Sequence, residues 1–232
     1  MFVGILPCSG RMRLPAVLFA ALLVVALPVH AARKIELKPE YLKKFNQAAQ
    51  AYEAQDYDKA LSLIAEAEKI QELTAATPNL RGAVALDREN FDEARKQFEA
   101  SLRVNPYFFP AKFNLADIPF RKKNYAQARA MYETILAQSP KNELVQYRIF
   151  LTYLLEKNMT EAEKARDAIK FPGETPAYYF AHACWEWTNG KTREGDSFIR
   201  SAQDIFGPAR CRLFFEPLEN LGWVKKKAEK KA

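Results

Sequence analysis

The sequence predicts an all-α protein of about five antiparallel helix pairs that follow one another along the chain. The first observation is a repeated stretch at residues 56–60, 90–94, 124–128 and 158–162, whose final alanines lie 34 residues apart. A looser copy at residues 191–195 ends 33 residues later. A fixed period of this length is typical of stacked two-helix units. The residues after each stretch keep the apolar spacing of a helix, which is the second observation.

Each repeated stretch predicts a turn followed by the second helix of a pair. The opening residue carries a side-chain oxygen that can accept from the free N–H groups of the first helical turn. A large apolar residue follows, and then an alanine, where a larger side chain would hold the two helices apart. Pro106 and Pro140 end two of these helices, because proline cannot continue a helix. The expected N-cap residues are Asp56, Asn90, Asn124 and Asn158.

In chain order, we expect repeats at about 41–74, 75–108, 109–142, 143–175 and 176–207 within a domain of residues 32–221. Thr77-Pro78 and Thr175-Pro176 predict helix starts, since proline is favoured at the first helical position. Pro119 predicts a kink in the first helix of repeat three. A short helix at residues 209–221 is expected to cap the array.

This pattern resembles the tetratricopeptide repeat family over roughly residues 41–206. Copy four departs from it with Phe150 in place of a small residue, and copy five departs with Gly195 in place of alanine. The resemblance implies a right-handed α-solenoid, of an exported bacterial type, whose first helices line a concave groove. The matching residues are Ala49, Gly82, Ala116, Tyr57, Phe91, Tyr125, Ala60, Ala94, Ala128, Ala162, Phe98, Tyr132, Pro106 and Pro140.

Residues at matched places on the first helices form columns that become apolar and aromatic from repeat three onward. Repeat one is assigned the polar residues Asn46, Gln50 and Glu53 at these places. One reading is a groove that binds an apolar peptide or helix of another protein. The other reading is that the stripe packs as core against the adjacent repeat or the terminal helix. The candidate groove residues are Phe113, Asp117, Phe120, Tyr147, Leu151, Leu154, Phe180 and Trp187.

The N-terminus predicts a secretory signal peptide at residues 1–31. Arg11 and Arg13 precede a run of 14 uncharged, mostly apolar residues, and small residues surround Ala31, where we expect cleavage. The alternative is a membrane anchor, although a span needs about 20 apolar residues. The chain is therefore expected to be periplasmic or secreted, with no transmembrane span after signal removal. Both Met1 and Met12 are possible starts.

The charge balance does not predict a nucleic-acid surface. Without residues 1–31, the chain has 33 basic and 28 acidic residues, and four of its five net positive charges come from residues 225–232. The folded body is therefore close to neutral. Residues 222–232 are expected to form a basic, solvated and disordered tail.

The sequence does not predict an enzyme, a metal site or a cofactor. It has no Gly-rich phosphate loop and none of the common hydrolase motifs, and His182 is the one histidine after residue 31. Cys184 and Cys211 could pair as a disulfide in an oxidising compartment, or they could pack as small apolar residues.

The sequence thus predicts a non-catalytic scaffold in the cell envelope that binds another protein or peptide. The alternative is an envelope assembly factor that acts by self-association or by docking to a membrane complex. The sequence names neither the partner nor the oligomeric state.

Overall fold

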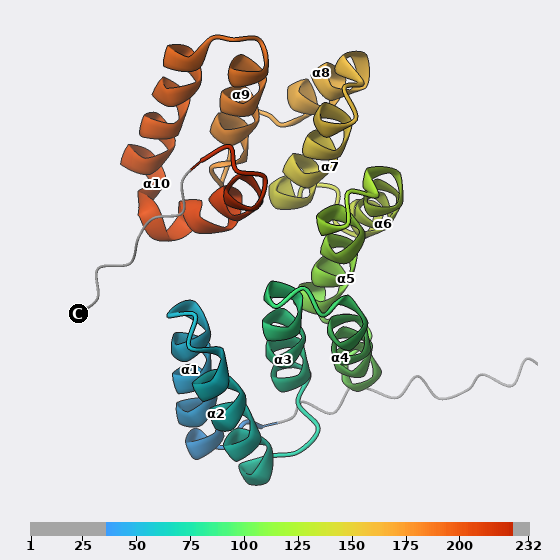
Figure 1. The fold of residues 1–232 in the computed structure, drawn as a ribbon, viewed down its shortest axis with the longest axis vertical. Helices are drawn as coiled ribbons and strands as arrows, with labels where there is room; N and C mark the ends of the chain where they lie inside the picture. Colours follow the sequence, from blue (N-terminus) through green and yellow to red (C-terminus); the bar gives the residue numbers. More distant parts are fainter. Residues whose placement is uncertain (1–35, 225–232) are drawn as a thin grey trace, which may run out of the picture. The chain divides into compact units, whose positions relative to one another are not determined.

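The computed structural model describes residues 36–224, so the expected signal peptide and the lysine-rich end lie outside the described residues. Contacts divide the chain after Glu36, and the unit that begins at Leu37 is described here. All regular secondary structure between residues 36 and 224 is helical (Figure 1). No helix in this range combines the length and the apolar character that a membrane span requires. The prediction of an all-α solenoid of repeats is confirmed.

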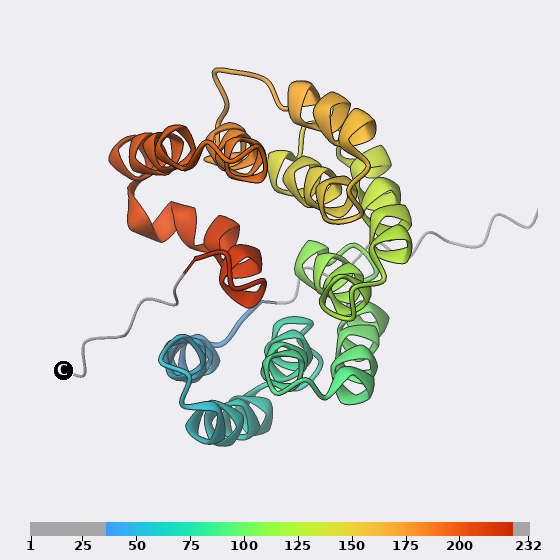
Figure 2. The ribbon, with the colours of Figure 1, turned by 45° about the horizontal axis from the view of Figure 1, so that its top comes forward.

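The helices form successive pairs, and each helix packs on its pair partner and on a helix of a neighbouring pair. In the tilted view of Figure 2, the pairs follow one another around a curve. The helices are α1 (Pro39–Glu53), α2 (Tyr57–Ile70), α3 (Ala76–Asp87), α4 (Phe91–Val104), α5 (Phe109–Arg121), α6 (Tyr125–Gln138), α7 (Glu143–Leu155), α8 (Met159–Ala168), α9 (Ala177–Thr188) and α10 (Thr192–Asn220).

The predicted caps are confirmed. In α2, α4, α6 and α8, the side chain of the cap residue accepts from the backbone N–H three residues later. The residue before each cap adopts a positive φ, between 56° and 60°, which reverses the chain between the two helices. These turn residues are Gln55, Glu89, Lys123 and Lys157.

Small residues allow the paired helices to approach closely. The alanines that end the four repeated stretches are fully buried. At Gly82, a Cβ atom would lie 2.6 Å from the ring of Phe98, so even alanine does not fit without a shift. At Gly195, a Cβ atom would lie 2.4 Å from Trp187, which explains why this copy has glycine in place of alanine.

The register predicted for repeat one was wrong by one residue. The fully buried small residue of α1 is Ala48, which precedes Gly82 by 34 residues, whereas Ala49 is only half-buried. The period is kept because the caps Asp56 and Asn90 are themselves 34 residues apart. The residue matching Leu86 is therefore Tyr52, and not the exposed Glu53.

One expected helix start also changes. α3 begins at Ala76, and the Thr77 hydroxyl lies 2.8 Å from the hydroxyl of Thr74 instead of capping the helix. α8 ends at Ala168. α5 continues through Pro119 to Arg121, so the proline at which a kink is expected lies inside an unbroken helix.

The last helix turns back on itself. α10 is interrupted at Gly207, whose φ of 77° and ψ of 160° belong to a region that is essentially restricted to glycine. We call residues 208–224 the C-terminal segment. In Figures 1 and 2 its helical part lies on the inside of the curve, beside the first helices of the pairs. The terminal helix is therefore present, and it lies on the aromatic part of the concave side.

Candidate functional site

The C-terminal segment occupies the aromatic part of the concave side. The ring of Phe214 lies 5.4 Å from Tyr147 and 5.5 Å from Phe180, between ring centroids. Phe215 packs edge-on against Phe180 at 4.7 Å. The Tyr147 hydroxyl donates to the backbone carbonyl of Phe214 over 3.2 Å. Tyr147 and Phe180 are consequently buried by residues of the same chain.

The eight candidate groove residues are not a single open surface. Seven of them are buried: Phe113, Asp117, Phe120, Tyr147, Leu151, Leu154 and Phe180. Trp187 is half-buried, and its Nε1 donates to Asp196 over 3.0 Å. In the structure of the isolated chain, most of these side chains are therefore packed as core, which is the second of the two interpretations of the aromatic stripe. Asp117 and Phe120 also line an open cavity on the concave side, which is described below.

The two cysteines are free thiols in the structure. The Sγ atom of Cys184 lies 3.8 Å from the Tyr147 hydroxyl, while that of Cys211 donates to the carbonyl of Ala202 over 3.5 Å. Burial raises the pKa of Cys184 to about 12, so this thiol stays protonated at neutral pH. The structure thus has the packed thiols, and not the possible disulfide.

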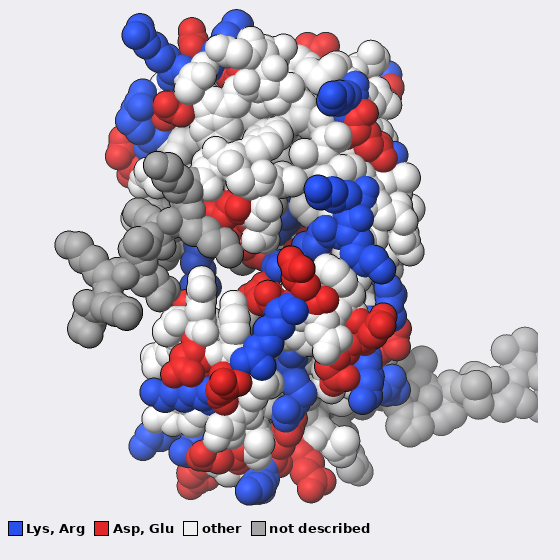
Figure 3. Space-filling model, in the orientation of Figure 1, with Lys and Arg blue, Asp and Glu red and all other residues white. Residues whose placement is uncertain are grey.

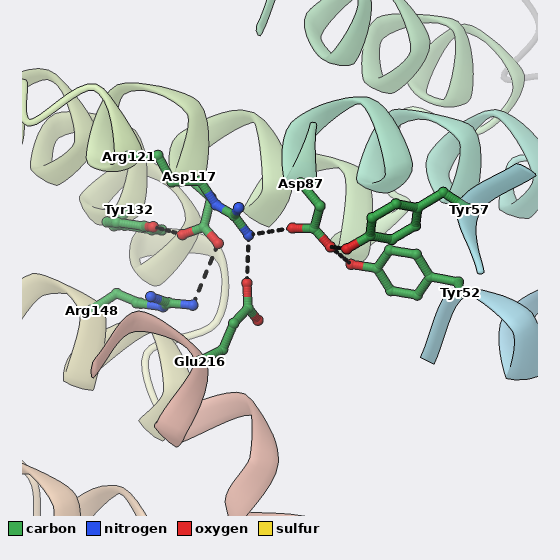
Figure 4. Close-up of polar contacts among 8 residues, drawn as sticks. All are labelled: Tyr52, Tyr57, Asp87, Asp117, Arg121, Tyr132, Arg148 and Glu216. Carbon is green, nitrogen blue, oxygen red and sulfur yellow. Dashed lines mark hydrogen bonds and ion pairs between the residues drawn. The ribbon is translucent and has the colours of Figure 1, made fainter. Parts of the chain in front are cut away.

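A cluster of polar side chains joins the first helices of four repeats to the C-terminal segment (Figure 4). Within it, the side chain of Arg148 on α7 is only 2% exposed and pairs with Asp117 on α5 at 3.4 Å. The Tyr132 hydroxyl donates to the same carboxylate. We call this group the polar cluster, and its members are Tyr52, Tyr57, Asp87, Asp117, Arg121, Tyr132, Arg148 and Glu216.

Two aromatic rings complete the surroundings of Arg148. Its guanidinium carbon lies 5.4 Å from the centroids of both Phe113 and Phe120, within the range of cation–π attraction. Burial is the largest influence on the pKa of Arg148 and lowers it, but the surrounding acidic groups, Asp117 first among them, together raise this pKa above its ordinary value. Burial, and next Asp117, also raise the pKa of Tyr132. The buried arginine therefore remains a cation beside a neutral phenol.

Arg121 links Asp87 and Glu216 within the polar cluster. It forms ion pairs with Asp87 on α3 at 2.9 Å and with Glu216 of the C-terminal segment at 2.7 Å. Asp87 in turn accepts from the Tyr52 hydroxyl over 2.8 Å. Burial, and next the Asp87 charge, raise the pKa of Tyr52. Charged hydrogen bonds thus hold together the C-terminal segment and repeats one, two and three.

An open cavity of about 520 Å³ lies beside the polar cluster, between α1, α3, α5 and the C-terminal segment. Asn114 donates to Asn79 over 3.1 Å on its wall, and an exposed ion pair joins Arg212 to Glu53 at 2.8 Å. In Figure 3, acidic and basic side chains are interspersed over the lower part of the view, where α1–α4 lie. A broad area over α7–α10 is largely uncharged.

The candidate residues predicted from the sequence include Asp117 but not Asp87, Arg121 or Glu216, which are charged members of the polar cluster. Asp87 and Arg121 are 34 residues apart, so they occupy equivalent places in neighbouring repeats and meet at 2.9 Å. The sequence could have indicated this ion pair, because it has two oppositely charged residues separated by one repeat length. Glu216 gave no such signal, because the position of the C-terminal segment does not follow from the repeat. Among residues 36–224, no group of His, Cys, Asp and Glu side chains is arranged to hold a metal ion.

Part of the chain matches a known family, and its fold resembles solved structures of that family. Residues 79–143 match the model of the tetratricopeptide repeat. A thermophilic tetratricopeptide-repeat protein of Thermus thermophilus, TTC0263, superposes with a TM-score of 0.61, covering 78% of this chain and 98% of that chain at 16% identity. The chain therefore contains tetratricopeptide repeats and has the fold of tetratricopeptide-repeat proteins. This family generally supplies non-catalytic scaffolds for protein–protein interaction.

Two further solved structures are similar in fold. MamA from Desulfovibrio magneticus RS-1, from residue 41 to its end, has a TM-score of 0.51 at 14% identity, covering 73% of this chain and 97% of that chain. A tetratricopeptide-repeat protein of Parabacteroides merdae ATCC 43184 has a TM-score of 0.51 at 17% identity, covering 83% of this chain and 82% of that chain. No curated protein matches the sequence.

Proposed function

We propose that this tetratricopeptide-repeat protein is a non-catalytic scaffold that binds a segment of another protein on the concave side of its repeats. The observation that carries the proposal is the open cavity of about 520 Å³ between α1, α3, α5 and the C-terminal segment. Ligand sites in proteins commonly have volumes of roughly 300–1,000 Å³. The cavity is therefore large enough for several residues of a peptide.

The cavity wall suits a polar peptide backbone. The side-chain amides of Asn79 and Asn114 can each donate and accept, and each has further capacity beyond their mutual hydrogen bond. Arg148 also lines the cavity, but its Nε atom, which has no hydrogen-bond partner among the described residues, is buried and out of reach of a peptide in the cavity.

Catalysis is not part of the proposal, because the carboxylates of the polar cluster are engaged. Asp87 and Glu216 are paired with Arg121, and Asp117 accepts from Tyr132 and Arg148. A general base needs a carboxylate that can take a proton from a substrate. These carboxylates instead hold helices together.

We also propose that the protein acts outside the cytoplasm, in the periplasm or the surrounding medium. The support is the sequence of residues 1–31 alone, with its basic start, its apolar run and its small residues before Ala32. The partner would then be another exported protein or the exposed part of a membrane protein.

A capture experiment tests the proposed function. The mature protein is immobilised beside a double variant, Asn79→Ala with Asn114→Ala, and beside a control, Glu133→Ala, on the exposed side of α6. Proteins from the cell envelope fraction are passed over all three and identified by mass spectrometry. We expect one partner to bind the wild type and the control, and to bind the double variant at least tenfold less. Equal capture by all three would contradict binding in the cavity.

A further inference from the structure

We propose that the C-terminal segment is an internal ligand of the concave side, and that an amphipathic helix of the partner protein binds there by displacing it. The inference rests on the proposed function only for the existence of an outside partner. We infer a helix as the binding partner because a helix of this chain, the C-terminal segment, already lies on the concave side.

The inner face of the segment has the pattern of a helix that binds a groove. Cys211, Phe214 and Leu218 are buried, and they lie at positions i, i+3 and i+7 of one helical face. Leu213, which lines the open cavity, is 50% exposed. Helices that bind grooves in other proteins use apolar anchors with this spacing.

Polar contacts fix the segment on the same surface. Glu216 pairs with Arg121 at 2.7 Å, and the Phe214 carbonyl accepts from the Tyr147 hydroxyl at 3.2 Å. The ion pair with Arg121 favours a carboxylate at the position of Glu216, two residues after the aromatic anchor Phe214. The surface would therefore favour a partner helix with an aromatic residue, an acidic residue two positions later, and an apolar residue two positions after that.

The connection to the rest of the chain permits exchange. The segment is joined to the preceding part of α10 through Gly207, and a Cβ atom built at Gly207 would meet nothing within 4 Å. The turn thus depends on the backbone conformation of this glycine and on no side-chain contact. A linked ligand acts at an effective concentration in the millimolar range, so it masks the surface until a tighter helix competes.

The test uses the full mature chain and a fluorescent synthetic peptide of residues 208–224, under reducing conditions. Two variants weaken the internal contact without touching the surface beneath it. Leu218→Ala removes a buried anchor, and Gly207→Ala strains the turn. Leu213→Ala is the matched control, because it makes the same chemical change at an exposed position. Fluorescence anisotropy measures binding of the peptide.

We expect both variants to bind the peptide at least tenfold more tightly than the wild type, because the occupied fraction of the surface falls. The control should stay within about twofold of the wild type. A variant dimer that exchanges its segments, detected by light scattering, would count as the same result. If peptide affinity is equal in all four proteins, or if both variants lose cooperative unfolding, the segment is fixed core and the proposal is overturned.

This assay needs no partner protein, so its outcome is separate from that of the capture experiment. Tight peptide binding to the variants with no captured partner would support the internal ligand and count against the proposed function. The reverse result would leave the scaffold role in place and remove the displacement.

Discussion

Arg121 and Asp87 are joined by an ion pair of 2.9 Å across 34 residues of sequence, which is one repeat. The same guanidinium group also pairs with Glu216 at 2.7 Å. One side chain therefore links two neighbouring repeats and the C-terminal segment. Because Arg121 is largely buried, removing this side chain should cost more stability than removing one partner of a surface ion pair does.

The first prediction concerns that link. Arg121→Ala leaves two carboxylates close together without a cation, so we expect a loss of about 1–3 kcal/mol in the free energy of unfolding. Arg88→Ala removes an ion pair with the exposed Asp58 and should change stability by less than about 0.5 kcal/mol. Denaturant unfolding of both variants measures the two effects. Equal small losses would show that Arg121 does not join the repeats.

The second prediction concerns the buried aromatic side chains of the concave side. Tyr147 is fully buried against Phe150, Phe180 and Phe214, so Tyr147→Ala should cost about 3–5 kcal/mol, as aromatic truncations in cores do. Tyr107→Ala is the control, because Tyr107 is 85% exposed. A nearly unchanged melting temperature for Tyr147→Ala would mean that this residue lies in an open groove.

The third prediction concerns the close approach of α5 and α6. Ala128 is fully buried, so Ala128→Leu should destabilise the protein by about 1–3 kcal/mol through overpacking. Glu133→Leu, on the exposed side of the same helix, should be nearly neutral. Thermal melts compare the two, and equal shifts would contradict the repeat register.

The fourth prediction concerns the two thiols. Because burial raises the pKa of Cys184 to about 12, the neutral form predominates at pH 8 in the folded protein. Cys211 is buried as well, and burial raises its pKa too. We expect both thiols of the mature chain to react slowly with a chromogenic disulfide in the native state. In denaturant, both should react at once, and the absence of free thiols there would reveal a disulfide.

The fifth prediction concerns export. Mature protein isolated from the native cell should begin near Ala32, because the signal features end there. N-terminal sequencing measures the first residue directly. A mature chain that retained residues 14–27 would instead support the membrane-anchor alternative.

The helix pairs could be predicted because each is specified locally. Asn90 caps its own helix, Pro106 ends the same helix, and Ala94 sets the contact with the pair partner, all within one repeat. The regular period then places successive pairs side by side. The one-residue error in α1 arose where Ala48 and Ala49 are adjacent, since either could have been the small contact residue.

The state of the concave side could not be predicted in the same way. Whether Tyr147 and Phe180 face solvent or another helix depends on the single turn at Gly207, which directs residues 208–224 inward. The presence of Gly207 in the sequence predicts a turn, but it does not predict the direction in which the chain turns. The ion pair of Arg121 with Glu216 spans 95 residues, beyond the reach of any repeat pattern.

Site-specific photo-crosslinking tests the central claim, binding of a protein segment on the concave side, most directly. A photoreactive amino acid replaces Glu53, an exposed residue of the cavity wall, or Glu133, an exposed residue of α6 outside the cavity, in the native cell. We predict that the Glu53 position crosslinks to one defined segment of one partner protein and that the Glu133 position does not. Crosslinks to the same partner in equal yield from both positions, or none from Glu53, would contradict the account.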